Sequence, residues 1–137
     1  MFEQIPILDS DEFHRTLMKK PQDVKIVRIG DLRESDDVEN GFYFYIHFML
    51  VESNQEVRIG FNVIRNNEGK FFVGEGAKLY PLVSYVSHID EGNITFTKQD
   101  IDESMEGLTF KASASREKFG NKKYFIIFPV GDEGERN

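Results

Sequence analysis

The chain of 137 residues contains no cysteine and no tryptophan, and it has only three histidines. Without cysteine, disulfides, thiolate metal ligands and a cysteine nucleophile are all excluded. The three histidines, His14, His47 and His88, are far apart and share no ligand spacing, so no metal site is expected. A chain without disulfides fits a reducing compartment, and we expect a cytoplasmic location.

Long apolar runs are also missing. No stretch approaches the roughly 20 consecutive apolar residues that span a bilayer. Residues 1–6 show neither a basic segment nor an apolar segment of the kind found in secretory signals. We therefore expect no membrane partner.

Catalytic groups do not converge in any recognisable pattern. Carboxylates such as Asp36, Asp37 and Glu52 fall in polar turns, and no Ser-His-acid set is apparent. The segment 74–76, Gly-Glu-Gly, lacks the rest of a phosphate-binding loop. The sequence therefore predicts no catalytic residue and no cofactor, and the protein is not expected to be an enzyme.

The net charge of −7 argues against an indiscriminate polyanion binder. The charge is unevenly distributed, however. Residues 107–124 hold five basic residues against one acid, and residues 131–137 hold three acids against one arginine. A basic segment followed by an acidic tail is more informative than the overall sum.

Phenylalanine is abundant, with 13 residues, and there are five tyrosines. Aromatic residues favour strands, and strands are also predicted where apolar and polar residues alternate with a period of two. The expected strands are residues 24–29, 42–51, 56–64, 108–115 and 122–129. Helices are expected over 11–20, from about 80 to 87, and from about 97 to a glycine cap at 107.

This order predicts a mainly β domain of the OB-fold type. The OB-fold is a five-stranded Greek-key barrel, here with a helix between strands 3 and 4 and a short N-terminal helix. The expected divisions are an N-terminal extension (1–22), an OB-like barrel domain (23–130) and an acidic flexible tail (131–137). Another small β-barrel, or a sandwich with a helical insert, is the alternative architecture.

The alternation also predicts the core. In strand 2 the even-numbered residues from 42 to 50 face inward, so that Tyr43, Tyr45, His47 and Met49 face outward. The residues expected to be buried are Phe44, Ile46, Phe48, Ile59, Phe61, Leu82, Phe110 and Ile126.

Three segments of the second half resemble a known class of proteins. They are residues 76–83 (GAKLYPLV), 105–112 (MEGLTFKA) and 120–127 (GNKKYFII). These segments are similar to those of OB-fold, single-strand-binding-like replication and recombination proteins of phages and mobile elements. The resemblance covers roughly residues 71–128 and implies binding of single-stranded DNA.

Two groups of residues are candidates for nucleic-acid binding. An OB-fold binds oligonucleotides on the face of strands 2 and 3, between its 1–2 and 4–5 loops, and single strands need aromatic platforms and cations. The candidates on strands 2 and 3 are Tyr43, Tyr45, Arg58 and Asn62. Those on the last hairpin are Arg116, Lys118, Phe119, Lys122 and Lys123.

Each group also has a purely structural explanation. The two tyrosines could pack under the N-terminal helix or at a dimer interface, because tyrosine is common in strands. The hairpin lysines could protect an edge strand from aggregation.

The sequence thus predicts a non-catalytic single-stranded DNA-binding protein of a phage or mobile element, with a replication or recombination protein as a further partner. Homo-oligomers are compatible with it. The alternative is an acidic protein-interaction barrel, an adaptor or inhibitor that binds no nucleic acid.

Overall fold

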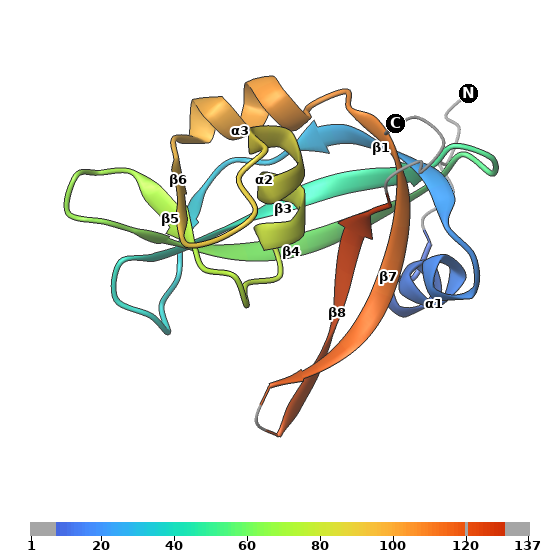
Figure 1. Ribbon diagram of the computed structural model, residues 1–137, viewed down its shortest axis with the longest axis horizontal. Coiled ribbons are helices and arrows are strands. Elements are labelled where there is room, and N and C mark those ends of the chain that lie inside the picture. Colours follow the sequence, from blue (N-terminus) through green and yellow to red (C-terminus); the bar gives the residue numbers. More distant parts are fainter. Residues whose placement is uncertain (1–7, 120, 131–137) are drawn as a thin grey trace, which may run out of the picture.

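The computed structural model describes residues 8–119 and 121–130, and among these the side chains of Phe119 and Lys122 are not described. The predicted tail, residues 131–137, and the first seven residues of the predicted extension lie outside the described residues. The described part forms three helices and eight strands (Figure 1). Their bounds are α1 Ser10–Lys19, β1 Gln22–Ile29, β2 Arg33–Glu34, β3 Gly41–Leu50, β4 Gln55–Arg65, β5 Phe71–Val73, α2 Tyr80–Ser87, β6 Ile94–Phe96, α3 Lys98–Met105, β7 Thr109–Phe119 and β8 Lys122–Pro129.

All eight strands belong to one antiparallel sheet, in the order β6-β5-β4-β3-β1-β7-β8, with β2 paired to β3. The mainly β class is therefore confirmed. The number of strands is corrected from five to eight: β1, β3, β4, β7 and β8 correspond to the predicted five, whereas β2, β5 and β6 are additional. In the part of the chain that is described, β4 and β8 do not pair, so the sheet is open.

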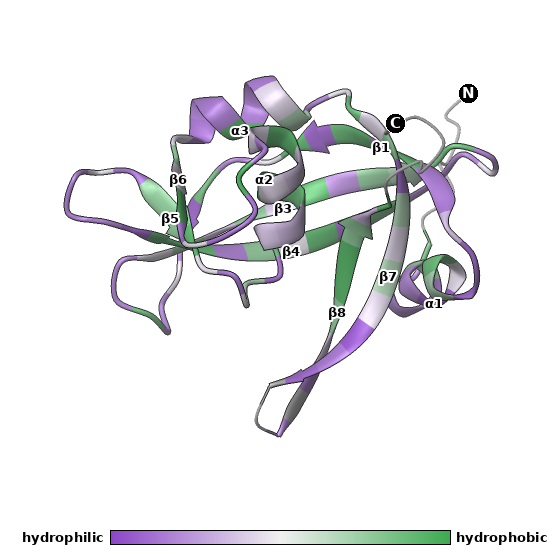
Figure 2. Ribbon diagram, viewed as in Figure 1, coloured by the Kyte–Doolittle hydropathy of each residue, from purple (hydrophilic) through white to green (hydrophobic). Residues whose placement is uncertain are grey.

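The hairpin of β3 and β4 forms the centre of the core. Ten residue pairs run from Gly41↔Ile64 to Leu50↔Gln55, and paired residues share a face of the sheet. Phe44, Phe48 and Phe61 on the inner face are almost fully buried, as predicted. Figure 2 shows apolar and hydrophilic residues alternating along β4. This alternation decides which side chains reach the outer face.

Helix α1 packs on the inner side of the open sheet and contacts β4, β7 and β8 (Figure 1). It starts at Asp9, whose carboxylate accepts a hydrogen bond from the backbone N–H of Asp11 at 2.8 Å. Phe13 and Leu17 are fully buried, with the Phe13 ring 5.9 Å from that of Phe48. Met18, the residue after Leu17, is 45% exposed. The helix thus covers apolar surface that a closed barrel would bury by strand pairing.

The two later helices form as predicted. Helix α2 begins at Tyr80 with Pro81 in its first turn, where a missing N–H costs no hydrogen bond. Helix α3 has a complete capping box, in which Thr97 and Asp100 each accept a hydrogen bond from the other's backbone N–H. Both helices lie against the inner side of the sheet, and α2 contacts β8 and β6.

One core prediction was wrong by a single residue. Ile127 is buried in β8, whereas Ile126 is only half-buried. Ile127 pairs with Ala114, which shares the inner face with Phe110. The two neighbouring isoleucines are chemically identical, so only this pairing, which is not visible in the sequence, determines which one faces the core.

Phe110 provides a test of this core. Its side chain is buried, and its ring lies 6.0 Å from that of Tyr85 in α2. Phe110→Ala should lower the free energy of unfolding by about 3–5 kcal/mol, because a large buried ring is removed. Urea denaturation measures this loss. Thr109→Ala, one residue away on the exposed face, is the matched control and should change stability by less than about 0.5 kcal/mol.

His14 is a buried polar residue in α1. Its Nδ1 lies 2.6 Å from the carbonyl oxygen of Ser10, to which it donates, and its ring stacks on Phe125 of β8 at 4.7 Å. Its Nε2 is buried without a hydrogen-bond partner. Burial lowers the pKa of His14 below its ordinary value of 6.5, and the charge of Lys78 lowers it further, against opposing effects of the Ser10 hydrogen bond and Asp11.

This lowered pKa makes the docking of α1 sensitive to acid. Since the pKa of His14 is lower in the folded state than in the unfolded chain, the unfolded chain binds more protons just below pH 6.5, and the contribution of His14 to stability rises with pH up to about 6.5. In His14→Phe this contribution disappears, so the free energy of unfolding should depend less on pH in that window. Denaturant unfolding at several pH values compares the two proteins, and equal slopes would contradict the assignment.

Candidate nucleic-acid interface

The outer face of β1, β3 and β4 carries the first group of candidate residues. Tyr43 pairs with Asn62, Tyr45 with Gly60 and His47 with Arg58. Since paired residues in an antiparallel sheet share a face, the structure brings Tyr43, Tyr45, Arg58 and Asn62 together, as the sequence predicted. Helix α1 lies on the inner side and does not cover them.

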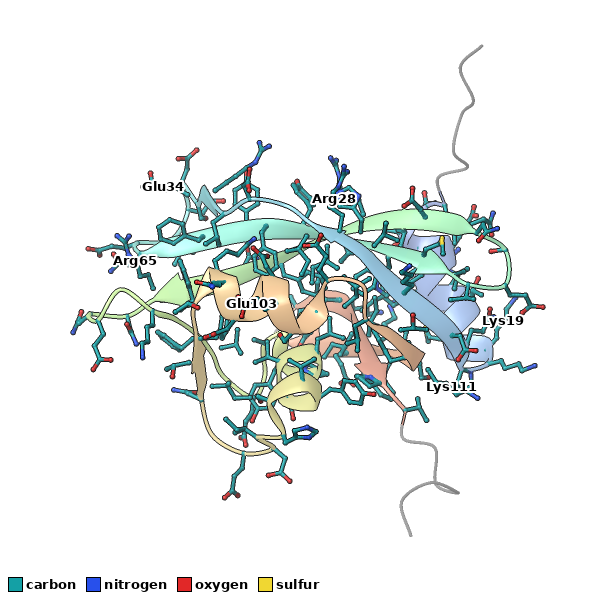
Figure 3. All side chains as sticks on the ribbon, turned by 90° about the horizontal axis from the view of Figure 1, so that it is seen from above. Lys19, Arg28, Glu34, Arg65, Glu103 and Lys111 are labelled. Carbon is teal, nitrogen blue, oxygen red and sulfur yellow. The ribbon has the colours of Figure 1, made fainter. Side chains whose placement is uncertain are left out.

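Arginines from two other strands extend this face. Arg28 of β1 pairs with His47, and Arg33 of β2 pairs with Tyr43. Figure 3 shows the side chain of Arg28 pointing away from the helices. The result is a surface that runs across four strands.

A groove of about 440 Å³ lies on this outer face. Among the residues that line it, three are arginines and one, Asp31, is acidic. The complete lining is Arg28, Ile29, Gly30, Asp31, Arg33, Tyr45, His47 and Arg58. A groove with this lining attracts anions even though the whole chain is acidic.

Tyr45 lines the groove and is held in place by its neighbours. It lies over Gly60, where an added Cβ would come within 3.3 Å of the ring atom Cε1. The guanidinium carbon of Arg58 is 4.4 Å from the ring centroid, which is a cation–π contact. The ring of Tyr43 meets that of Tyr45 edge-on at 6.0 Å. Stacking surface is thus offered by Tyr43 and by the planar guanidinium of Arg58, as well as by Tyr45 itself.

The surroundings of His47 favour the neutral form of its ring. The Nη2 atom of Arg28 lies 3.3 Å from His47 Nε2 and 3.5 Å from Nδ1. Because a guanidinium can only donate, the contact requires an unprotonated ring nitrogen. Burial and then the charge of Arg28 lower the pKa of His47, with a further lowering by Arg58 and an opposing effect of Glu56.

The hairpin candidates lie elsewhere. Arg116, Lys118 and Lys123 are exposed, but they follow Ala114 and Ile127 on the inner side of β7 and β8. The guanidinium of Arg116 is 5.7 Å from the ring of Phe125, which stacks on α1. The hairpin projects from the body of the protein (Figure 1), and β7 becomes hydrophilic toward its tip (Figure 2).

The structure therefore does not place these hairpin cations on the same face as Tyr43 and Tyr45. The side chains of the other two hairpin candidates, Phe119 and Lys122, lie outside the described residues.

Two arginines and the histidine of the groove were not among the sequence candidates: Arg28, Arg33 and His47. A register shift between Ile26 and Arg28 interrupts the alternation of β1 and turns Arg28 to the outer face beside His47. Arg33 belongs to β2, a two-residue strand without any periodic signal. The sequence places His47 on the outer face, but only the pairing of the strands shows that two arginines lie beside it.

Within residues 8–119 and 121–130, no cluster of three or more histidine or carboxylate side chains is arranged to hold a metal ion. Over the same ranges, none of the helices has the length and apolar character needed to cross a membrane. Comparisons with protein-family models, curated proteins and solved structures give no match to this chain.

The pairing of Arg28 with His47 is open to direct measurement. In Arg28→Gln the neighbouring positive charge is removed, so the pKa of His47 should rise. Histidine ring signals followed by NMR across a pH titration report this pKa. The matched control is Arg33→Gln, an arginine of the same groove for which no hydrogen bond to His47 is found. A shift of equal size in both variants would show that the direct contact has no role.

Proposed function

We propose that the protein binds single-stranded nucleic acid, DNA in the first instance, on the outer face of β1, β3 and β4, without catalysing a reaction. The observation that carries this proposal is the groove around Tyr45, in which three arginines meet aromatic side chains. Single-strand-binding proteins combine these two elements, with cations along the backbone and flat side chains against the bases.

The strand order supports an OB-like reading of the fold. Taken alone, the five longest strands follow the order β4-β3-β1-β7-β8, and α2 lies in the chain between β4 and β7. In this reading, β3 and β4 are the strands that an OB-fold uses to contact oligonucleotides. The proposed groove lies on their outer face.

The side chains then have two kinds of role, and Arg58 has both. Arg28, Arg33 and Arg58 pair with phosphates, while Tyr43, Tyr45 and the guanidinium plane of Arg58 stack on bases, as arginine planes also do. Asn62, directly opposite Tyr43, supplies an amide that can donate to or accept from a base edge. The resemblance over residues 71–128 supports a role in the replication or recombination of a phage or mobile element.

The hairpin cations Lys118 and Lys123 have a secondary role in this proposal. They lie on the inner side of the sheet. They can therefore contact nucleic acid only if the bound nucleic-acid chain continues from the groove around the β7–β8 hairpin. Comparing the loss of affinity in variants of these lysines and of the groove arginines distinguishes a site confined to the groove from one that extends to the hairpin.

Binding of a labelled oligonucleotide, followed by fluorescence anisotropy at several salt concentrations, tests the proposal. Tyr45→Ala should weaken binding by about 1–3 kcal/mol, the usual value of one stacked base. The double change Arg28→Gln and Arg58→Gln should lower the slope of log K against log salt by about 0.7 for each lost contact. Tyr85→Ala, a tyrosine on α2 that is 40% exposed, is the control for loss of an aromatic ring.

The charge-matched control is the double change Lys118→Gln and Lys123→Gln, which removes the same charge from the hairpin. It should reduce affinity less than the groove variant. An equal loss in both variants would assign the effect to overall charge or to an extended site. No binding even at low salt, where electrostatic attraction is greatest, would remove the nucleic-acid function and leave the acidic protein-interaction barrel.

A further inference from the structure

A second surface lies on the other side of the sheet, between α2, α3 and β6. Helix α2 contacts both α3 and β6 (Figure 1). Residues of the three elements and of the segment after α2 line a groove of about 470 Å³. Its floor consists of core side chains, Val83, Ile94, Phe96 and Ile101, and its wall includes Val86 and Ile89. The volume lies within the roughly 300–1,000 Å³ typical of ligand pockets.

Apolar surface is left open to solvent at the rim of this groove. Ile89, just after α2, is 45% exposed, although isoleucine gains more than most residues from burial. The side chain of Val86 is half-buried one turn earlier. The apolar floor therefore continues outward onto the surface instead of ending in a closed cavity.

The same rim is negatively charged. Asp100 and Glu103 line the groove, and Glu103 is labelled on α3 in Figure 3. Asp90 and Glu91 follow Ile89 directly and are exposed. The basic residue of this region, Lys98, is paired with Asp102 at 2.6 Å, so its charge is compensated. The groove thus presents carboxylates around an apolar floor.

We propose that this α2–α3 groove docks a basic amphipathic helix of a partner protein. Amphipathic helices bind apolar grooves through side chains spaced three and four residues apart. Lysines or arginines on the flanks of such a helix would meet Asp90, Glu91, Asp100 and Glu103, and this complementarity selects the partner and speeds the encounter.

Charge also excludes two other occupants. Nucleic acid is repelled by these carboxylates. The groove also lies on the other side of the sheet from the arginine-lined site, so this proposal does not depend on the proposed nucleic-acid binding. The chain's own C-terminal segment, residues 131–137, carries three acids against one arginine and would be repelled as well.

The probe is a fluorescein-labelled peptide of about 18 residues with leucines at helical spacing and lysines elsewhere, compared with the same peptide carrying glutamates. The lysine peptide should bind and the glutamate peptide should not.

The groove variant combines Ile89→Ser with Glu103→Lys, two exposed positions, and should weaken binding at least about ten-fold. The matched control combines Met18→Ser with Glu12→Lys on α1, where Met18 has the same 45% exposure. It should stay within about two-fold of the original protein.

Amide chemical shifts in the presence of the lysine peptide should change in α2, α3 and β6. Equal weakening of peptide binding in the groove and control variants would show that general charge attraction explains the binding, and would overturn the proposal. The absence of binding at low salt would overturn it as well. A concentration-dependent dimer that Ile89→Ser abolishes would assign the groove to a second copy of this chain and would overturn it too. Thermal melting of each variant confirms that it is folded.

Discussion

The register of β3 against β4 is the constraint on which both the core and the candidate site depend. Because side chains alternate at period two, a slip by one residue would bury Tyr45 and His47 and expose Phe44 and Phe48. Both ends of the hairpin are fixed by residues in the left-handed region, Asn40 with φ of 59° and Asn54 with φ of 57°. Asparagine tolerates this conformation better than most residues, which sets the turns and thereby the register.

The open edge of the sheet explains the role of the N-terminal segment. In a closed barrel, β4 and β8 would satisfy each other's free backbone groups and bury the apolar residues between them. Here the backbone N–H of Leu8 bonds to the carbonyl of Glu56 in β4 at 2.7 Å, and α1 inserts Phe13 and Leu17 into the core. The helix therefore replaces part of the missing closure. The orphaned Nε2 of His14 is a local cost of burying a polar ring in that position.

Local patterns in the sequence were sufficient for most elements. The helix from Tyr80 to Ser87, the start of a helix at about residue 97 and the inner face of β4 each depend on residues close together in the chain, and these predictions are confirmed. The pairing of β5 with β6 joins residues such as Phe71 and Phe96, which are 25 positions apart, and periodicity carries no information about such partners. The same limit applies to Ile126 and Ile127, and to the arginines beside His47.

The separation of charges over the surface reconciles the acidic chain with an anion-binding proposal. The outer face gathers Arg28, Arg33 and Arg58 around the single acid Asp31 of the groove lining, whereas the acids of α3 lie on the other side of the sheet. At physiological ionic strength, charges are screened beyond about 8 Å, so a phosphate in the groove responds mainly to the arginines that line it.

Distant carboxylates reduce the rate of encounter more than the strength of the bound contacts. A partner docked on the α2–α3 groove would neutralise some of those carboxylates. If both proposed surfaces are used, docking of the partner should therefore speed the encounter with nucleic acid more than it strengthens the bound contacts, without any change of shape.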